Sequence, residues 1–170
     1  MLSKSKNLEL LNIEGVQVDL DSTLGSHRQL RELNVKSNNK ITALPTTIGK
    51  CHKLESIELS GSSLRALTEQ IGKCSSLEEL YLNDCMICEL PPSLGDCRHL
   101  KTLELRNSQM KCLPEEIGNL LELKSIKLFQ SEISSLPSSI GNCQKLEKLE
   151  ACRCLNLKEL PIEIANCSKL

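Results

Sequence analysis

The sequence predicts an α/β repeat solenoid, a right-handed superhelix with a parallel β-sheet on its concave side and short helical or 3-10 segments on its convex side. Three observations support this fold class. The 170 residues repeat with a period near 23. Each period carries the same alternating apolar run, followed in most copies by Leu-Pro and Gly. Only one Tyr and one Phe are present, so the core must consist of stacked Leu and Ile layers rather than large aromatic side chains.

Seven units are found when the chain is aligned on the first leucine of each period. They begin at Leu8, Leu30, Leu54, Leu77, Leu100, Leu123 and Leu146, and Leu170 would open another. The spacings are 22, 24, 23, 23, 23, 23 and 24 residues. The shared pattern is L-x-x-L-x-L-x-x-(S/C/N)-x-(L/I)-x-x-L-P-x-x-I-G-x-C. We therefore expect residues 1–170 to form one domain of about seven repeats.

The run L-x-x-L-x-L predicts a short strand in every unit. Its fourth and sixth positions point inward, and its third, fifth and seventh positions point outward. Successive strands pair in parallel at a spacing of about 4.8 Å. A turn residue follows at the ninth position, where its side chain can bond to the backbone of adjacent turns. These turn residues are Asn38, Ser62, Cys85, Ser108, Ser131 and Cys154.

Proline and glycine are expected to delimit a short helical segment on the return path. The prolines fix φ and suit the first helical turn. They are Pro45, Pro91, Pro114, Pro137 and Pro161. The glycines are predicted to end the segment in a left-handed conformation. They are Gly49, Gly72, Gly95, Gly118 and Gly141.

Half of the ten cysteines form a column three residues before the next unit's first leucine. They are Cys51, Cys74, Cys97, Cys143 and Cys167. Leu120 fills the same slot in the fifth unit, so the position is predicted to be inward and apolar, with free thiols. Cys112 is expected on the surface. Cys85-Met-Ile-Cys88 has the spacing of a metal knuckle but lacks a second pair of ligands, so we predict no metal.

The two ends of the chain differ from the repeats between them. Leu2, Ser3 and Ser5 fall on the Ile, Gly and Cys slots of a preceding unit. The first unit is the least regular, with Asp21 where proline usually stands. Because repeat arrays end in polar caps and neither end carries one, we expect the domain to be uncapped and part of a longer array.

Composition excludes several classes of function. The formal net charge of −1 gives no reason to expect nucleic acid as a partner, and no apolar run reaches the roughly 18 residues of a membrane span. No apolar core of a signal peptide follows Met1, so we expect a cytoplasmic protein with reduced thiols. No catalytic or phosphate-binding motif is present, and the three histidines are expected to be solvated or half-buried. We predict no enzyme activity, no cofactor and a monomeric segment.

The outward strand positions are the predicted binding surface. They contain both aromatic residues of the chain, a preference typical of interface anchors. The predicted protein-binding residues are Glu58, Glu79, Tyr81, Asn83, Glu104, Arg106, Lys127, Phe129 and Glu150. Acidic side chains lie early along this surface and basic ones late. Either a mixed solvated face or a dipolar binding surface accounts for that gradient.

The motifs Leu-Pro-Pro-Ser-Leu-Gly-Asp-Cys (90–97), Leu-Pro-Glu-Glu-Ile-Gly-Asn-Leu (113–120) and Leu-Pro-Ser-Ser-Ile-Gly-Asn-Cys (136–143) resemble those of intracellular leucine-rich repeats. The resemblance extends over almost the whole chain and implies a horseshoe that binds protein on its concave face. Ras-group scaffolds and plant nucleotide-binding disease-resistance receptors share this form. Residues 146–161 resemble the plant receptors more. That group implies plant defence, innate immunity, signal transduction and autoinhibition of a neighbouring nucleotide-binding domain.

Two alternatives to a recognition module stay open at this stage. One is a structural spacer that binds nothing specific. The other is a substrate-recruiting domain of a larger enzyme, such as a ubiquitin ligase.

Overall fold

Seven short strands and seven 3-10 helices alternate along the computed structural model, which describes residues 7–170. The strands are β1 (Leu10–Asn12), β2 (Glu32–Asn34), β3 (Ser56–Glu58), β4 (Glu79–Tyr81), β5 (Thr102–Glu104), β6 (Ser125–Lys127) and β7 (Lys148–Glu150). The helices are η1 (Ser22–Ser26), η2 (Thr46–Lys50), η3 (Glu69–Lys73), η4 (Pro92–Asp96), η5 (Glu115–Asn119), η6 (Ser138–Asn142) and η7 (Ile162–Asn166).

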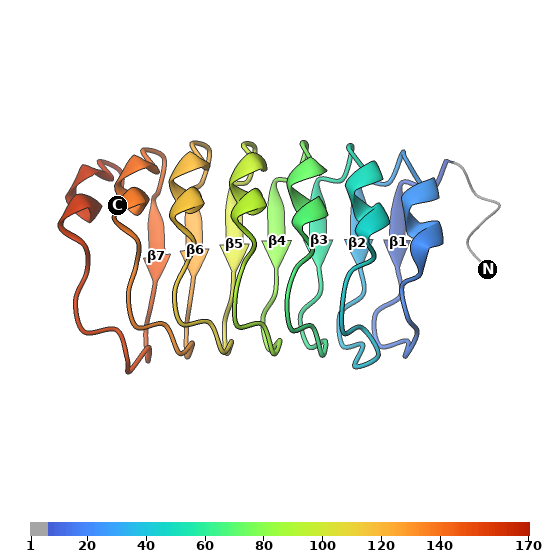
Figure 1. Cartoon of the computed structure of the whole chain (residues 1–170), viewed down its shortest axis with the longest axis horizontal. Coiled ribbons are helices and arrows are strands. Elements are labelled where there is room, and N and C mark those ends of the chain that lie inside the picture. The colour runs from blue at the N-terminus through green and yellow to red at the C-terminus, as the bar shows by residue number, and fades with distance from the viewer. Residues whose placement is uncertain (1–6) are drawn as a thin grey trace.

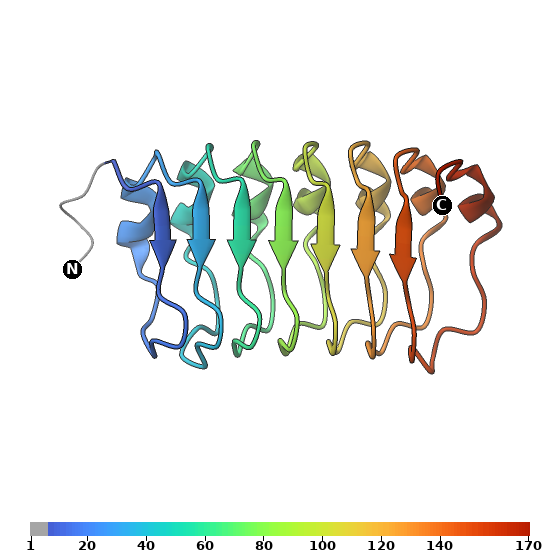
Figure 2. The ribbon, with the colours of Figure 1, turned by 180° about the vertical axis from the view of Figure 1, so that it is seen from behind.

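Each strand pairs in parallel with the next one along the chain, so the sheet order is β1-β2-β3-β4-β5-β6-β7. Figure 1 shows the helices in one row in front of the sheet, and Figure 2 shows the strands from the opposite side. The predicted fold class, a repeat solenoid with a parallel sheet and short 3-10 segments, is confirmed. The register joins identical positions of neighbouring repeats, as in Leu103 opposite Ile126.

Leucine and isoleucine layers fill the space between the sheet and the helices. The fourth and sixth positions of the fifth repeat, Leu103 and Leu105, are both completely buried. The corresponding Ile126 and Leu128 of the sixth repeat are buried equally well. The inward direction predicted for these positions is therefore correct. Burial of this kind contributes about 1.5–3 kcal/mol for each large aliphatic side chain.

The ninth-position turn residues are buried, and the side chains of all but Ser108 form hydrogen bonds to adjacent turns. The Asn38 side-chain amide donates to the carbonyl oxygen of Val18 at 2.7 Å. The Cys154 thiol donates to the carbonyl oxygen of Leu128 at 2.8 Å and lies 3.3 Å from Ser131 Oγ. These side chains replace backbone hydrogen bonds that the bend cannot make.

The residue at the eighth position of each repeat, just before the turn position, has a positive φ. The row consists of Gly15, Ser37, Gly61, Asp84, Asn107, Gln130 and Arg153, with φ between 52° and 71°. Only two of the seven are glycine, so the remaining five hold a conformation that is costly for L-residues. The repeated turn imposes this conformation on the backbone whatever the side chain.

The cysteine column is buried, as predicted, and its thiols are free. The Cys97 thiol donates to the carbonyl oxygen of Ile71 at 3.3 Å, and Cys143 contacts Ile117 in the same way at 3.4 Å. In the first repeat this slot is filled by His27, which is only 1% exposed. The expectation of a solvated or half-buried histidine is therefore wrong for His27, because it occupies an inward column position. The predicted surface position of Cys112 is confirmed.

The repeated glycines do not have the predicted left-handed conformation. Each is the fourth residue of a 3-10 helix, and only Gly15 and Gly61 have a positive φ among the described glycines. A Cβ added to Gly118 would lie 2.6 Å from the carbonyl oxygen of Ser139 in the next helix. Glycine is thus required because consecutive helices approach too closely for a side chain.

The prolines lie at the N-cap positions of η2, η4, η5, η6 and η7 rather than within the first helical turn. Their φ values, between −63° and −69°, are those that the ring imposes. Asp21 takes this place in η1, and its carboxylate accepts a hydrogen bond from the Thr23 amide at 2.8 Å. Asp21 therefore caps η1 through its side chain, as Thr68 caps η3, whereas the other five helices have a proline with a fixed φ at this position.

Leu2, Ser3 and Ser5, whose pattern predicts a preceding unit, lie outside the described residues. At the other end, Leu155 and Ile162 are 82% and 85% exposed. The expectation of a longer, uncapped array remains a prediction.

Candidate protein-binding surface

The outward side chains of the strands form one surface, which we call the strand face. It comprises the third, fifth and seventh positions of each repeat. Strand register aligns the fifth positions in a single row, with Tyr81 between Glu58 and Glu104. Lys127 and Glu150 continue the row on β6 and β7. The predicted contact residues are therefore brought together on adjacent strands.

An ion-pair network lies at the centre of the strand face. The Glu104 carboxylate is paired with the Lys127 ammonium group and lies 3.7 Å from Arg106 Nε. It also accepts a hydrogen bond from Asn83 Nδ2 at 3.0 Å. The guanidinium group of Arg106 reaches Glu150 at 3.8 Å. Because Glu104, Arg106 and Glu150 each have two or more partners, their side chains are held in one arrangement before any protein partner arrives.

Glu104 is only 8% exposed, which is unusual for a predicted contact residue. Burial raises the pKa of its carboxyl group, but hydrogen bonds from Lys127 and Asn83, with the positive charges of Lys127 and Arg106, hold the pKa below its ordinary value. The carboxylate is thus ionised and fully engaged at neutral pH. It positions the cations around it and has little surface left for a partner.

Tyr81 is half-buried among carboxylates on the strand face. Burial, the negative charge of Glu79 and a hydrogen bond to Glu79 raise the pKa of the Tyr81 hydroxyl to about 12, with smaller contributions from Glu104 and Glu58. The phenol therefore stays protonated and can donate a hydrogen bond. Its ring offers apolar contact area with little loss of conformational entropy.

Phe129 is the second aromatic residue of the strand face and is also half-buried. With Arg106, Glu150 and Cys152 it lines a depression of about 280 Å³. The guanidinium carbon of Arg153 lies 5.5 Å from the ring centroid, within cation–π range. This contact orients Arg153 at the edge of the strand face.

The acidic early part of the strand face differs from its paired late part. Glu32, Glu58 and Glu79 form no ion pair within residues 7–170. The Glu58 carboxylate accepts only from the Ser60 amide at 2.9 Å, while Glu79 accepts from Ser56 Oγ at 3.3 Å. The cations of the late half are paired with the carboxylates of Glu104 and Glu150. The strand face is therefore acidic in its early half and nearly neutral in its late half.

Sequence reasoning did not identify Gln130, Arg153 or Leu155, which line a hollow at the loop edge beside Phe129. A signal was present in the sequence, because the seventh repeat is one residue longer than the four before it. Its effect on the loop depends on the backbone path, which the repeat pattern does not define.

Other kinds of site find no support in the part of the chain that the structure describes. Within residues 7–170, no group of three or more His, Cys, Asp or Glu side chains could hold a metal ion. No helix there is long and apolar enough to cross a membrane. Cys85 is buried and its Sγ lies 3.4 Å from Ser62 Oγ, so it acts as a turn residue and not as half of a metal knuckle.

Two family profiles match the sequence. The profile described as "Leucine-rich repeat region" matches residues 92–170. The profile described as "Leucine rich repeat" matches residues 28–87. No curated protein matches the chain significantly.

Solved structures with the same architecture are numerous. A leucine-rich repeat protein of Leptospira interrogans is 27% identical, with a TM-score of 0.74 over 99% of this chain and 50% of its own. The plant peptide hormone receptor RGFR1 in complex with RGF2 is 30% identical, with a TM-score of 0.81 over 97% of this chain and 28% of its own. The leucine-rich repeat domain of the type III effector XopL, at 24% identity and a TM-score of 0.73, shares the fold over 95% of this chain and 66% of its own.

The chain thus spans half the length of the Leptospira protein and about a quarter of the hormone receptor.

Proposed function

Because the chain belongs to the leucine-rich repeat family, we propose that it is a protein–protein interaction module whose strand face binds a protein partner. The observation that carries this proposal is the placement of its only Tyr and only Phe. Tyr81 and Phe129 are half-buried on the strand face, on either side of the network around Glu104. Aromatic anchors beside pre-organised charges are typical of the centre of a protein interface.

Protein ligands are also recorded for relatives with this architecture. RGFR1 was solved in complex with RGF2, and the leucine-rich repeat ectodomain of an Arabidopsis receptor kinase, at 21% identity, was solved in complex with CASPARIAN STRIP INTEGRITY FACTOR 2. Leucine-rich repeats generally serve as interaction scaffolds rather than catalysts. We extend to this chain only the class of ligand, a protein or peptide.

The acidic early half of the strand face defines the charge expected of the partner. The carboxylates of Glu32, Glu58 and Glu79 have no cation among the described residues and remain available to basic side chains. Of the two interpretations of the charge gradient, we therefore adopt a charged binding surface rather than a solvated face, with its unpaired charge confined to the acidic early half. A partner would place basic residues over β2–β4 and an apolar residue against Phe129.

The biological setting is a further part of the proposal. We place the domain in the cytoplasm, as a monomeric recognition or autoinhibitory region of a larger immune receptor or signalling scaffold. The resemblance of residues 146–161 and the free thiols support this setting. Sequencing the gene on both sides of residues 1–170 tests it directly. A nucleotide-binding domain would support the receptor, and a ubiquitin-ligase module would favour the substrate-recruiting alternative.

The binding role is tested by affinity capture with the full chain as bait. Tyr81→Ala and Phe129→Ala should each reduce recovery of specific partners at least roughly tenfold, as expected when an interface anchor worth about 2 kcal/mol is lost. Leu121→Ala is the matched control, because Leu121 is 56% exposed and follows η5 rather than lying on a strand. Unchanged capture by correctly folded Tyr81 and Phe129 variants would leave the structural-spacer alternative standing.

A further inference from the structure

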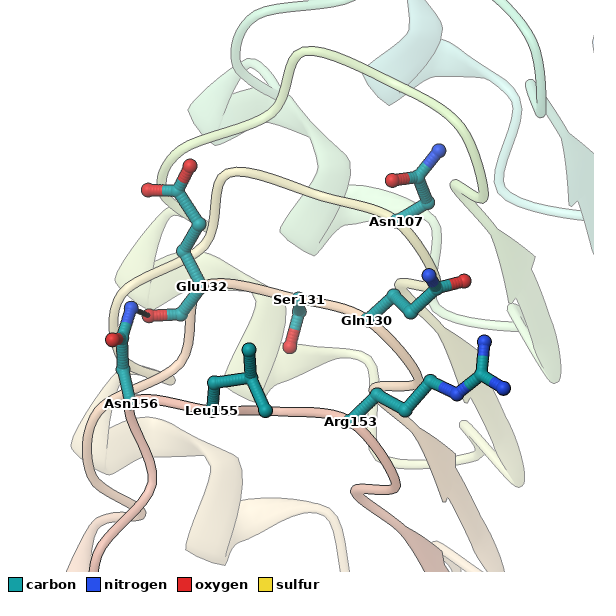
Figure 3. A pocket seen from close by; sticks show the side chains of 7 residues that line it. All are labelled: Asn107, Gln130, Ser131, Glu132, Arg153, Leu155 and Asn156. Carbon is teal, nitrogen blue, oxygen red and sulfur yellow. Dashed lines mark hydrogen bonds between the residues drawn. The ribbon is translucent and has the colours of Figure 1, made fainter.

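A hollow of about 420 Å³ lies at the loop edge of the fifth to seventh repeats (Figure 3). It lies beside the strand face and is lined mainly by residues of the turns. The lining residues are Asn107, Gln130, Ser131, Glu132, Arg153, Leu155 and Asn156. Leu155 is 82% exposed, which is rare for a leucine in an otherwise regular array.

An extra residue in the seventh repeat accompanies the hollow. Leu160 follows the turn residue Cys154 by six positions, whereas Leu136 follows Ser131 by five. The second repeat has the same extra residue, because Leu44 follows Asn38 by six positions. The chain therefore contains two copies of this longer loop, one early and one late.

In the second repeat the longer loop is occupied by a side chain of the repeat before it. Gln17 Nε2 donates to the carbonyl oxygen of Ser37 at 2.9 Å. Gln17 Oε1 accepts from the Asn39 amide at 3.0 Å. One carboxamide group thus bridges a backbone acceptor and a backbone donor two residues apart, which only a group with both functions can do.

The seventh repeat presents the same two backbone groups without such a bridge. The residue corresponding to Ser37 is Arg153, and the two share the left-handed conformation with φ of 58° and 60°. The residue corresponding to Asn39 is Leu155. Within residues 7–170, neither the Arg153 carbonyl oxygen nor the Leu155 amide has a hydrogen-bond partner.

Glu132 occupies the position that corresponds to Gln17, but a carboxylate has no donor for the Arg153 carbonyl oxygen. Figure 3 shows its side chain directed away from Leu155 and Arg153. Glu132 contributes instead through its backbone, whose carbonyl oxygen accepts from Asn156 Nδ2 at 3.4 Å. The seventh repeat therefore lacks the bridge because Glu132 stands where the loop of the second repeat has Gln17.

We propose that this hollow binds an asparagine or glutamine side chain of a protein partner, which bridges the Arg153 carbonyl oxygen and the Leu155 amide as Gln17 does in the second repeat. An acidic residue next to that side chain pairs with the Arg153 guanidinium group. Arg153 has no ion-pair partner among the described residues and is oriented by its contact with Phe129. The inference rests on the proposed function in that the ligand is a protein segment.

Synthetic peptides test the ligand chemistry without a known partner. The probes are three fluorescein-labelled pools with the cores Asp-Gln, Asp-Glu and Asp-Leu, each flanked by randomised residues. Fluorescence anisotropy with the full chain should show the Asp-Gln pool binding roughly tenfold more tightly than the other two, which corresponds to about 1.4 kcal/mol. Equal binding of the three pools overturns the proposal.

A pair of variants at Glu132 tests whether this position is equivalent to that of Gln17. Glu132→Gln should fill the hollow with its own side chain and reduce binding of the Asp-Gln pool roughly tenfold, again about 1.4 kcal/mol. Glu132→Ala should leave the hollow open and retain binding. In the absence of peptide, NMR should show slower solvent exchange of the Leu155 amide in Glu132→Gln than in Glu132→Ala. Identical exchange rates overturn the proposed equivalence with Gln17.

The results separate this inference from the proposed function. Selective binding of the Asp-Gln pool together with unchanged partner capture by Tyr81→Ala and Phe129→Ala supports the hollow and rejects the strand-face interface. Loss of capture together with equal binding of all pools supports the strand face and rejects the hollow.

Discussion

The carbonyl oxygen of Ser139 lies in the space that a side chain on Gly118 would occupy. A Cβ built on Gly118 would be 2.6 Å from that oxygen and 2.7 Å from Ser139 Cβ. The fourth-position glycines of η1 to η4 and of η6 approach a backbone oxygen of the next helix in the same way, so consecutive 3-10 helices are packed backbone to backbone. The distance between consecutive 3-10 helices is therefore set by the absence of a side chain on these glycines.

Gly118→Ala should destabilise the domain by about 1–3 kcal/mol, because the methyl group forces the η5 and η6 helices apart. Urea denaturation followed by circular dichroism measures the change. Ala165→Gly is the matched control, since Ala165 occupies the same position in η7 and is exposed. It should change stability by less than about 1 kcal/mol. Equal effects of the two substitutions would contradict the packing role of glycine.

The buried core makes a second prediction. Leu128 is completely buried between the layers, and Leu128→Asp places an unpaired charge there. The variant should lose its cooperative thermal transition, while Leu128→Ala should cost about 2–5 kcal/mol and keep one. Differential scanning calorimetry distinguishes the two. Leu121→Asp, at an exposed leucine, should melt like the wild type; a cooperative transition in Leu128→Asp would argue against the layered core.

Glu104 gives the domain a pH dependence. Its folded-state pKa lies below the unfolded value, so its contribution to stability is present above the unfolded pKa of about 4.3 and is lost as the pH falls through the lower folded pKa. Glu104→Gln should therefore cost roughly 2 kcal/mol at pH 7, and less as the pH falls below about 4. Urea titrations between pH 3 and pH 7 measure the difference. Glu32→Gln, at a carboxylate outside the network, is the matched control and should change stability by less than about 1 kcal/mol at pH 7.

The thiols divide into two groups by reactivity. Burial, with a smaller effect of neighbouring ionisable groups, raises the pKa of Cys74, Cys97 and Cys143 to about 12. Such thiols remain protonated at pH 8 and are shielded from reagents. Iodoacetamide at pH 8 should modify the exposed Cys88, Cys112 and Cys152 and spare the other seven cysteines until urea is added. Mass spectrometry of the labelled peptides measures the extent of modification at each cysteine. Rapid labelling of Cys74, Cys97 or Cys143 in the folded protein would contradict their protected packing.

Much of the fold could be predicted because the apolar alternation and the period leave one arrangement that buries the pattern leucines of the second to sixth repeats. The strand at Ser125–Lys127, the turn residue Ser131 and the buried Cys143 all follow from the pattern of the sixth unit. The role of glycine could not be predicted in this way. A glycine required for a positive φ and one required for close approach look the same in a sequence.

The candidate site was predictable only in outline. The pattern placed Glu104 and Lys127 on neighbouring outward positions, and their pairing follows from strand register. The extent of the network, and the burial of Glu104 that results from it, depends on side-chain packing. The hollow depends on the path of a loop with one extra residue, and the equivalence of Glu132 and Gln17 follows from the way both longer loops fold.

The strictly sequential order of the sheet has a consequence for how such a gene can change. Within residues 7–170, strands and helices contact only those of adjacent repeats. An in-frame duplication or deletion of one unit would recreate the same contacts on both of its sides, without a compensating change elsewhere. Unequal recombination can therefore move Phe129 and its neighbours relative to Tyr81 by one strand in a single genetic event, giving a new binding surface on an unaltered scaffold.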